Sequence, residues 1–188
     1  MKKLFGLLAL VLAVVSCQND FDGTNVRGDE VAVTLNVAVP DDATRAAGSD
    51  SAKSGLQNID LQNDYDIRYI LEVYDALGNL AKPRIVNREG DSKSTSFDLR
   101  LVPGRKYTFV VWADFIPQDQ EDEKVDYHYN TSNIKAISLN GEQKANDESR
   151  DAYTCAYVVE EFQSGAPIAI ELKRPFAKLR VVTTDMEH

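Results

Sequence analysis

The feature that most constrains the fold of this 188-residue chain is alternation of apolar and polar residues with a period of two. It is clearest between residues 31 and 39, where every second residue is apolar and Pro40 ends the run. The apolar positions are Val31, Val33, Leu35, Val37 and Val39. Successive side chains of a β-strand point to opposite faces, so the pattern predicts a strand with one buried face.

Similar short segments recur, separated by glycine, proline and other turn residues. They cover residues 67–75, 80–86, 95–101, 107–115, 153–162, 168–172 and 178–183, while 116–150 is rich in loop residues with at most one short element near 134–139. Pro83 predicts that 80–86 lies at a sheet edge, and the apolar run 107–115 predicts a central strand covered on both faces. The pattern predicts an all-β fold, a sandwich of antiparallel sheets without a long helix.

Pro103-Gly104 stands between the segments 95–101 and 107–115. Proline presets a negative φ, and glycine supplies the positive φ that a type II turn requires at the next position. We therefore expect these two segments to form a hairpin.

The N-terminus carries a targeting signal. Lys2 and Lys3 precede an apolar run from residue 4 to residue 15, which ends at Ser16-Cys17. The run is too short for a membrane-spanning helix, which needs about 20 residues. The pattern predicts a lipoprotein signal peptide over 1–16, acylation of Cys17, a tether over 17–29 and a domain over 30–188 with an exposed loop at 40–66. An ordinary secretory signal with a chance cysteine is the alternative.

Composition excludes several classes of function. A net charge of −9 makes nucleic acid an improbable partner, because basic residues must neutralise its phosphates. Once Cys17 is acylated, Cys155 has no partner for an internal disulfide and is expected to be a small apolar group of a strand. The acidic run 118–123 lacks the spaced ligands and glycine of a calcium loop, and no zinc or phosphate motif is present, so no metal or cofactor is predicted.

Catalytic signatures are also missing from the sequence. His128 lies between two tyrosines without a serine or cysteine nucleophile motif, and no pair of carboxylates stands out among the 30 acidic residues. We therefore expect the protein not to be an enzyme.

Several short motifs resemble those of the fimbrillin-type lipoproteins of Bacteroidetes. They are the Cys17 signal, the first strand, Thr44-Arg45, Leu101 to Tyr107, Trp112-Ala113-Asp114 and Arg174 to Lys178. The resemblance implies a transthyretin-like antiparallel β-sandwich of about seven strands. It also implies display at the outer membrane through the lipid anchor, as a structural or adhesive fimbrial subunit or anchor whose partners are other such subunits.

In polymerising members of that family a protease cuts the loop after the first strand, which leaves and is replaced by a segment of a partner. Carried over to this chain, the resemblance places the cut after Arg45 and makes the strand from Val31 to Val39 the exchanged one. The triplet Asp50-Ser51-Ala52 matches the O-glycosylation pattern of exported proteins in that group, which suggests a sugar on Ser51.

Two expectations remain open. Members of the family continue for several strands beyond the position of residues 180–185, so a chain ending at His188 either takes a strand from a partner or is a truncated product with unpaired edges. The alternative function is a monomeric surface module that binds glycans or a host protein, for which tyrosine, tryptophan and phenylalanine should cluster on an exposed face.

Overall fold

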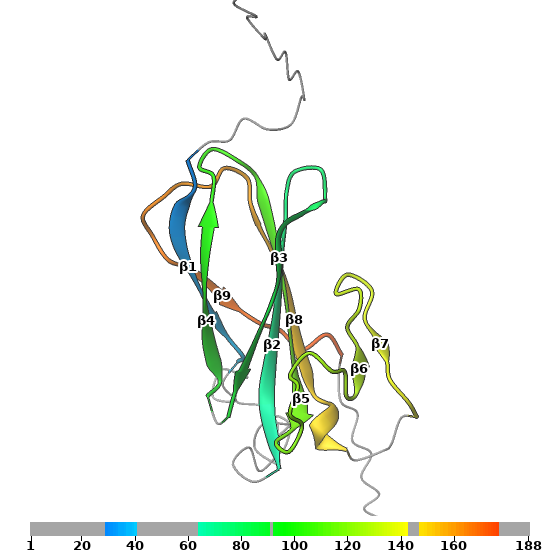
Figure 1. Cartoon of the computed structure of the whole chain (residues 1–188). Helices are drawn as coiled ribbons and strands as arrows, with labels where there is room; N and C mark the ends of the chain where they lie inside the picture. Colours follow the sequence, from blue (N-terminus) through cyan, green and yellow to red (C-terminus); the bar gives the residue numbers. More distant parts are fainter. Residues whose placement is uncertain (1–28, 41–63, 91, 143–146, 177–188) are drawn as a thin grey trace, which may run out of the picture.

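The computed structural model describes residues 29–40, 64–90, 92–142 and 147–176 (Figure 1). Over these ranges the chain is built from strands and one short 3₁₀ turn. The strands are β1 (Val31–Ala38), β2 (Tyr65–Tyr74), β3 (Leu80–Glu89), β4 (Ser94–Leu101), β5 (Tyr107–Pro117), β6 (Tyr129–Asn130), β7 (Ser138–Leu139), β8 (Ala152–Val159) and β9 (Ile168–Glu171), and the turn η2 is Glu148–Arg150. The described ranges include no helix with the length and apolarity needed to cross a membrane.

The strands form two packed sheets, which confirms the predicted all-β sandwich. Sheet A has the order β4-β1-β9, and sheet B has the order β3-β2-β5-β8. Every pair in sheet B is antiparallel, as is β1 with β4, but β9 lies parallel to β1. The reason is the connection over residues 160–167, which lies at the end of the sandwich where β1 starts, so β9 runs in the same direction as β1 (Figure 1).

Alternation places the core between the sheets. In β4, Thr95, Phe97, Leu99 and Leu101 are buried while the residues between them are exposed. On the outer face of sheet A, polar side chains pair across strands: Thr34 Oγ1 donates to Asp98 Oδ1 at 2.8 Å, and Ser96 Oγ donates to Asn36 Oδ1 at 2.9 Å. The sheet therefore has one dry and one solvated face, as its sequence pattern requires.

The predicted hairpin between 95–101 and 107–115 is wrong. Gly104 does have a positive φ of 74°, so the turn forms, but β4 pairs with β1 in sheet A and β5 pairs with β2 and β8 in sheet B. Residues 102–106 therefore bridge the two sheets, which stack about 10 Å apart in sandwiches. The Phe162 carbonyl accepts from the Gly104 N–H at 2.7 Å, which fastens this bridge to the segment after β8.

The prediction that β5 is central and covered on both faces is confirmed. Its inner face contributes Phe109, Val111 and Phe115 to the main core. Its outer face contributes Val110 and Trp112 to a second apolar cluster, in which Tyr129 and Ile134 cover them. These last residues belong to an excursion over residues 118–150, in which β6 and β7 pair beside the sandwich (Figure 1).

Other boundaries agree with the sequence or fall outside the described ranges. Pro83 lies in β3, an edge strand as predicted, and β2 begins at Tyr65, within the loop expected at 40–66. Cys17, Arg45, Ser51, the signal peptide and the strand expected at 178–183 all lie outside the residues that the structure describes.

Candidate functional site

The strand expected to be exchanged, β1, lies between β4 and β9 in sheet A. Four of its five predicted inward residues are almost completely buried: Val33, Leu35, Val37 and Val39 are 7%, 0%, 1% and 4% exposed. Val31 is half-buried and packs against the same core. The structure thus brings the five residues together on one face, where they form a continuous part of the core.

The neighbours of β1 come from distant parts of the chain. Its whole length pairs with β4, from Val31 opposite Leu101 to Ala38 opposite Ser94. On the other side β9 pairs only with residues 35–38. Pro167 directly precedes β9 and has no N–H, so the ladder stops there. Within the described ranges the first half of β1 therefore has a ladder partner on one side only.

A few polar contacts hold the ends of β1. Lys82 Nζ lies 2.6 Å from Glu30 Oε1, and Arg100 donates to the Glu30 carbonyl at 2.7 Å. At the other end, Leu172 N–H donates to the Ala38 carbonyl at 2.8 Å. Exposed ion pairs contribute little to stability, so burial of the apolar face and the backbone ladders are the main contacts that hold the strand.

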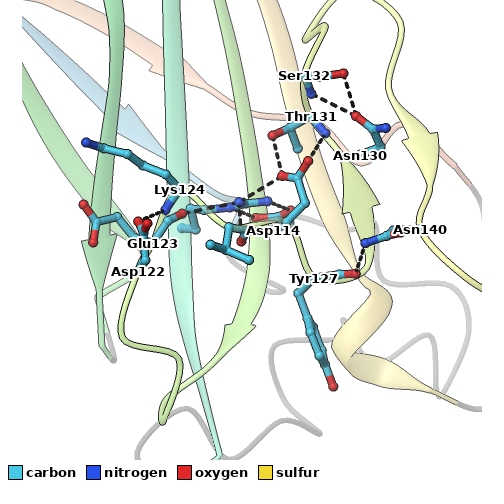
Figure 2. Close-up of polar contacts among 12 residues, drawn as sticks. Asp114, Asp122, Glu123, Lys124, Tyr127, Asn130, Thr131, Ser132 and Asn140 are labelled. Carbon is cyan, nitrogen blue, oxygen red and sulfur yellow. Dashed lines mark hydrogen bonds and ion pairs between the residues drawn. The ribbon is translucent and has the colours of Figure 1, made fainter.

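The second notable region is a buried ionic network that fixes the excursion to sheet B. Arg68, in the middle of β2, is 0% exposed, and its Nε and Nη2 donate to Asp114 of β5 at 2.8 and 2.6 Å. Its Nη1 donates to the carbonyls of Glu123 and Val125 at 3.3 and 3.1 Å and to Asp126 at 3.2 Å. Figure 2 shows Asp114 between Glu123 on one side and Thr131 on the other.

Asp126 extends this network into the next turn, because its carboxylate accepts from the N–H and the hydroxyl of Thr131 at 2.8 and 2.7 Å. Two arginines of β3 also pair with an acidic residue of β2 and donate to backbone carbonyls of the excursion. Arg88 binds Asp66 and donates to the carbonyls of Gln118 and Gln120. Arg84 pairs with Glu72 and donates to the Ser132 carbonyl at 3.3 Å. The sheet therefore holds the excursion mainly through guanidinium groups that donate to loop carbonyls.

The electrostatics of this network indicate a structural role. Burial alone would lower the pKa of Arg68, but the hydrogen bonds and charge of Asp114, followed by the charge of Asp126, outweigh it and raise that pKa. Arg68 is therefore a permanent cation whose donors are directed at acceptors of the protein itself. A group in this state has no proton to give to a substrate.

The surroundings of His128 and Cys155 also indicate structural roles for these two residues. His128 is buried within the excursion, and its Nε2 lies 2.7 Å from Ser149 Oγ. Cys155 is half-buried against the core, and burial raises the pKa of its thiol, which disfavours the reactive thiolate. Among the described residues, no group of three or more His, Cys, Asp or Glu is arranged to hold a metal ion.

Exposed aromatic residues do not form a common platform. Trp112 is buried at 4% exposure, whereas Tyr127, Tyr157 and Phe176 are the exposed aromatic residues of the described ranges and lie on three separate segments. The ring of Tyr127 points away from the polar network in Figure 2. The arrangement gives no specific support to a glycan-binding face.

Sequence analysis did not identify Arg68 and Glu72 of β2 as buried charged groups. A usable signal was present, because a cation and an anion, Arg68 and Asp114, each lie within a largely apolar central strand. Arg174, from a motif singled out in the sequence, also forms a buried pair, with Asp151 beside Tyr153.

Comparison with known proteins gives three findings. No curated protein matches the chain significantly. A solved structure described as a fimbrial assembly protein from Parabacteroides distasonis is similar with a TM-score of 0.34 and 13% identity, covering 78% of this chain and 54% of that one, so the chain spans about half of that protein. The model of one protein family matches residues 23–188. The chain therefore belongs to the family described as "Family of unknown function (DUF6562)".

Proposed function

We propose that this chain is a lipid-anchored surface subunit that performs no catalysis and joins neighbouring fimbrial-type subunits by exchange of β1. The observation that carries the proposal is the arrangement of β1. Its inward side chains fill the core, yet among the described residues it pairs only with β4 and β9, which are far from it in sequence. A strand placed in this way is held non-covalently once the chain between it and β2 is cut.

The free energy of burying β1 favours its replacement by a partner strand over its simple loss. Each buried Val or Leu side chain contributes about 1.5–3 kcal/mol, so loss of β1 would expose a large apolar groove. A partner strand with the same alternation could fill the groove and restore the ladder with β4. Without a replacement, the subunit would be strongly destabilised, so release and insertion are expected to be coupled.

The order of segments along the chain adds a consequence. Cys17 precedes β1, and the proposed cut after Arg45 follows it. Cleavage and strand release would therefore separate the acylated N-terminal piece from the rest of the sandwich. We propose that the uncut protein is anchored at the outer membrane through Cys17 and that processing frees its body for assembly.

A peptide-binding experiment tests the exchange. The protein is treated with an arginine-specific protease and then mixed with a fluorescent peptide copying residues 31–39, and binding is followed by anisotropy. We expect binding after cleavage and none before it. A peptide with Leu35 and Val37 replaced by Asp is the matched control, because it keeps the backbone but cannot enter the core. If neither peptide binds the cleaved protein, strand exchange is excluded.

The anchor is tested separately. Incorporation of labelled palmitate is compared between the wild type and Cys17→Ala, and membrane association is measured in parallel. We expect both to be lost in the variant. Equal labelling of the two proteins would show that Cys17 is not the acylated residue. In a background with Arg27→Gln, which removes the arginine between Cys17 and β1, an Arg45→Gln variant should stay membrane-bound after protease treatment.

A further inference from the structure

Three of the four sheet edges in the described sandwich carry features that block the addition of another strand. The edge strand β3 contains Lys82, Pro83 and Arg84 in its middle. The edge strand β4 carries Asp98 and Arg100. The third, β9, has four residues and follows Pro167 directly. Charges, proline and short length are the devices by which proteins protect exposed edges.

The fourth edge, β8, has none of these features. Its sequence from Ala152 to Val159 contains no charged residue, no proline and no glycine. Its second half is solvent-exposed, with Tyr157 at 41% and Val158 at 46% exposure. A flat, apolar edge of this kind is a template for pairing with another strand.

The backbone atoms available for pairing can be identified. Thr154 exchanges two hydrogen bonds with Lys173, at 2.8 and 2.9 Å, on the side away from β5. Because backbone direction alternates along a strand, the N–H and C=O groups of Ala156 and Val158 also point away from β5. Beyond Thr154, no strand in the described ranges pairs with that side of β8.

The chain that passes this edge leaves it at Lys173. Arg174 lies against Asp151 and Tyr153, and Phe176 stacks on Tyr129, so residues 173–176 run toward the start of β8. They move away from Ala156 and Val158. Within these residues the second half of the edge stays open.

We propose that two copies of this chain associate by antiparallel pairing of β8 about a two-fold axis at Tyr157. In this register Ala156 of one copy lies opposite Val158 of the other and Cys155 lies opposite Val159. The groups that face outward then form four hydrogen bonds, two for each Ala156 and Val158 pair. The two B sheets become one continuous sheet, and the contact is self-complementary, as two-fold symmetry requires.

The uncharged segment of β8 is the part of this edge that a second, equally acidic copy can approach with the least repulsion. Each chain has a net charge of −9, so two copies repel one another over most of their surfaces. The segment from Cys155 to Val159 is uncharged, and the proposed register sets apolar residues against apolar residues. Glu160, the first charge beyond it, lies past the paired residues, on the side of the other copy where Lys173 occupies the position opposite Thr154, and not opposite a second glutamate. The contact is small, so the association is weak and depends on concentration.

The proposal does not require β1 to leave, and it is tested on the uncut full-length chain. Sedimentation is measured over a wide range of protein concentrations, in detergent with micelles in excess so that two copies do not share one. We expect the wild type to dimerise. Val158→Pro removes the outward N–H in both copies without touching the ladder to β5, and should weaken dimerisation about tenfold or more.

Val158→Thr is the matched control, because it keeps the β-branched shape and the N–H and should dimerise like the wild type. Near-ultraviolet circular dichroism checks that both variants are folded. Association through residues 1–28 would be the same in all three proteins. A wild type that stays monomeric at every concentration, or a folded Val158→Pro variant that dimerises equally well, overturns the proposal.

Cross-linking tests the register. In a background with Cys17→Ser and Cys155→Ser, Tyr157→Cys places two thiols across the axis in a non-hydrogen-bonded pair. The Cα atoms of such a pair lie about 4.5 Å apart, within the range of about 4.4–6.8 Å for a disulfide. We expect oxidation to give a covalent dimer. Leu80→Cys, at an even more exposed site on β3, is the control, and equal cross-linking of the two would refute this register.

Discussion

Replacement of Arg68 by methionine tests the role assigned to the buried network. The change keeps much of the length of the side chain but removes the donors that bind Asp114, Asp126 and the carbonyls of Glu123 and Val125. It leaves Asp114, at 1% exposure, as a buried carboxylate without its main counter-ion. Removal of one partner of a buried ion pair costs about 3–5 kcal/mol. A domain has roughly 5–15 kcal/mol of stability in all, so the expected loss is large.

A double-mutant cycle separates the ion pair from the anchoring of the loop. Substituting both residues, Arg68→Met with Asp114→Leu, leaves no buried charge, and paired replacement by apolar residues of similar volume is often close to neutral. The double variant should therefore be destabilised by less than the sum of the two single variants, by at least about 2 kcal/mol. The remaining loss reflects the carbonyls that Arg68 no longer holds.

Urea unfolding followed by tryptophan fluorescence is a suitable assay, because Trp112 is the single tryptophan and lies under the excursion. Hydrogen exchange of residues 118–131 gives a local readout, and protection should fall there in every variant that lacks Arg68. The reasoning is refuted if Arg68→Met costs less than about 1 kcal/mol or if the two single effects simply add.

Three further perturbations probe other parts of the fold. Leu35→Ala in β1 should cost about 2–5 kcal/mol in urea unfolding, because it leaves a cavity in the core, whereas Asn36→Ala on the solvated face should cost far less; equal losses would contradict the assigned faces. Gly104→Ala should cost about 1 kcal/mol, because Gly104 has a φ of 74°, and an unchanged unfolding midpoint would contradict this. Burial, followed by the hydrogen bond and charge of Glu72, raises the pKa of Tyr74 to about 12, which favours the neutral phenol in the folded state. Stability should therefore be intact below about pH 10 and fall as the pH rises toward 12. Tyr74→Phe should reduce that slope, and an equal slope in both proteins would count against the pKa shift.

Much of the fold could be predicted from local pattern. In β1 and β4 one face is dry and the other wet, so alternation indicated both strands, and for β1 it also gave the inward residues correctly. In β5 both faces are covered, and the loss of alternation indicated a central strand. These predictions succeeded because the order of apolar and polar residues within each segment indicates which faces of the strand are buried.

Pairing between strands could not be predicted in the same way. The Pro103-Gly104 turn was identified correctly, but a turn fixes only a local reversal of the chain, and whether the next strand joins the same sheet depends on contacts far away in sequence. Phe162, which follows β8, packs edge-on against Tyr107 and fastens the bridge between the sheets. Nothing near residue 104 carries that information.

The buried arginines were missed for a related reason. A charge within an apolar strand is normally assigned to the solvent side. Arg68 is buried because an excursion more than fifty residues later covers it, as its contact with Val125 shows. Its partner Asp114 lies in a different strand, so only knowledge of the β2–β5 register would have joined the two.

The parallel pair of β1 and β9 has a consequence for how the chain acquires its structure. The first of the described strands to emerge during synthesis pairs with the last of them, since Leu35 lies beside Ile168. Until that late segment arrives, β1 has at most one of its two neighbouring strands in sheet A, and closing so long a loop is slow. During synthesis the protein must therefore pass through a stage in which the edge of β1 that later binds β9 is unpaired. Any extended polypeptide nearby could pair with β1 at that stage.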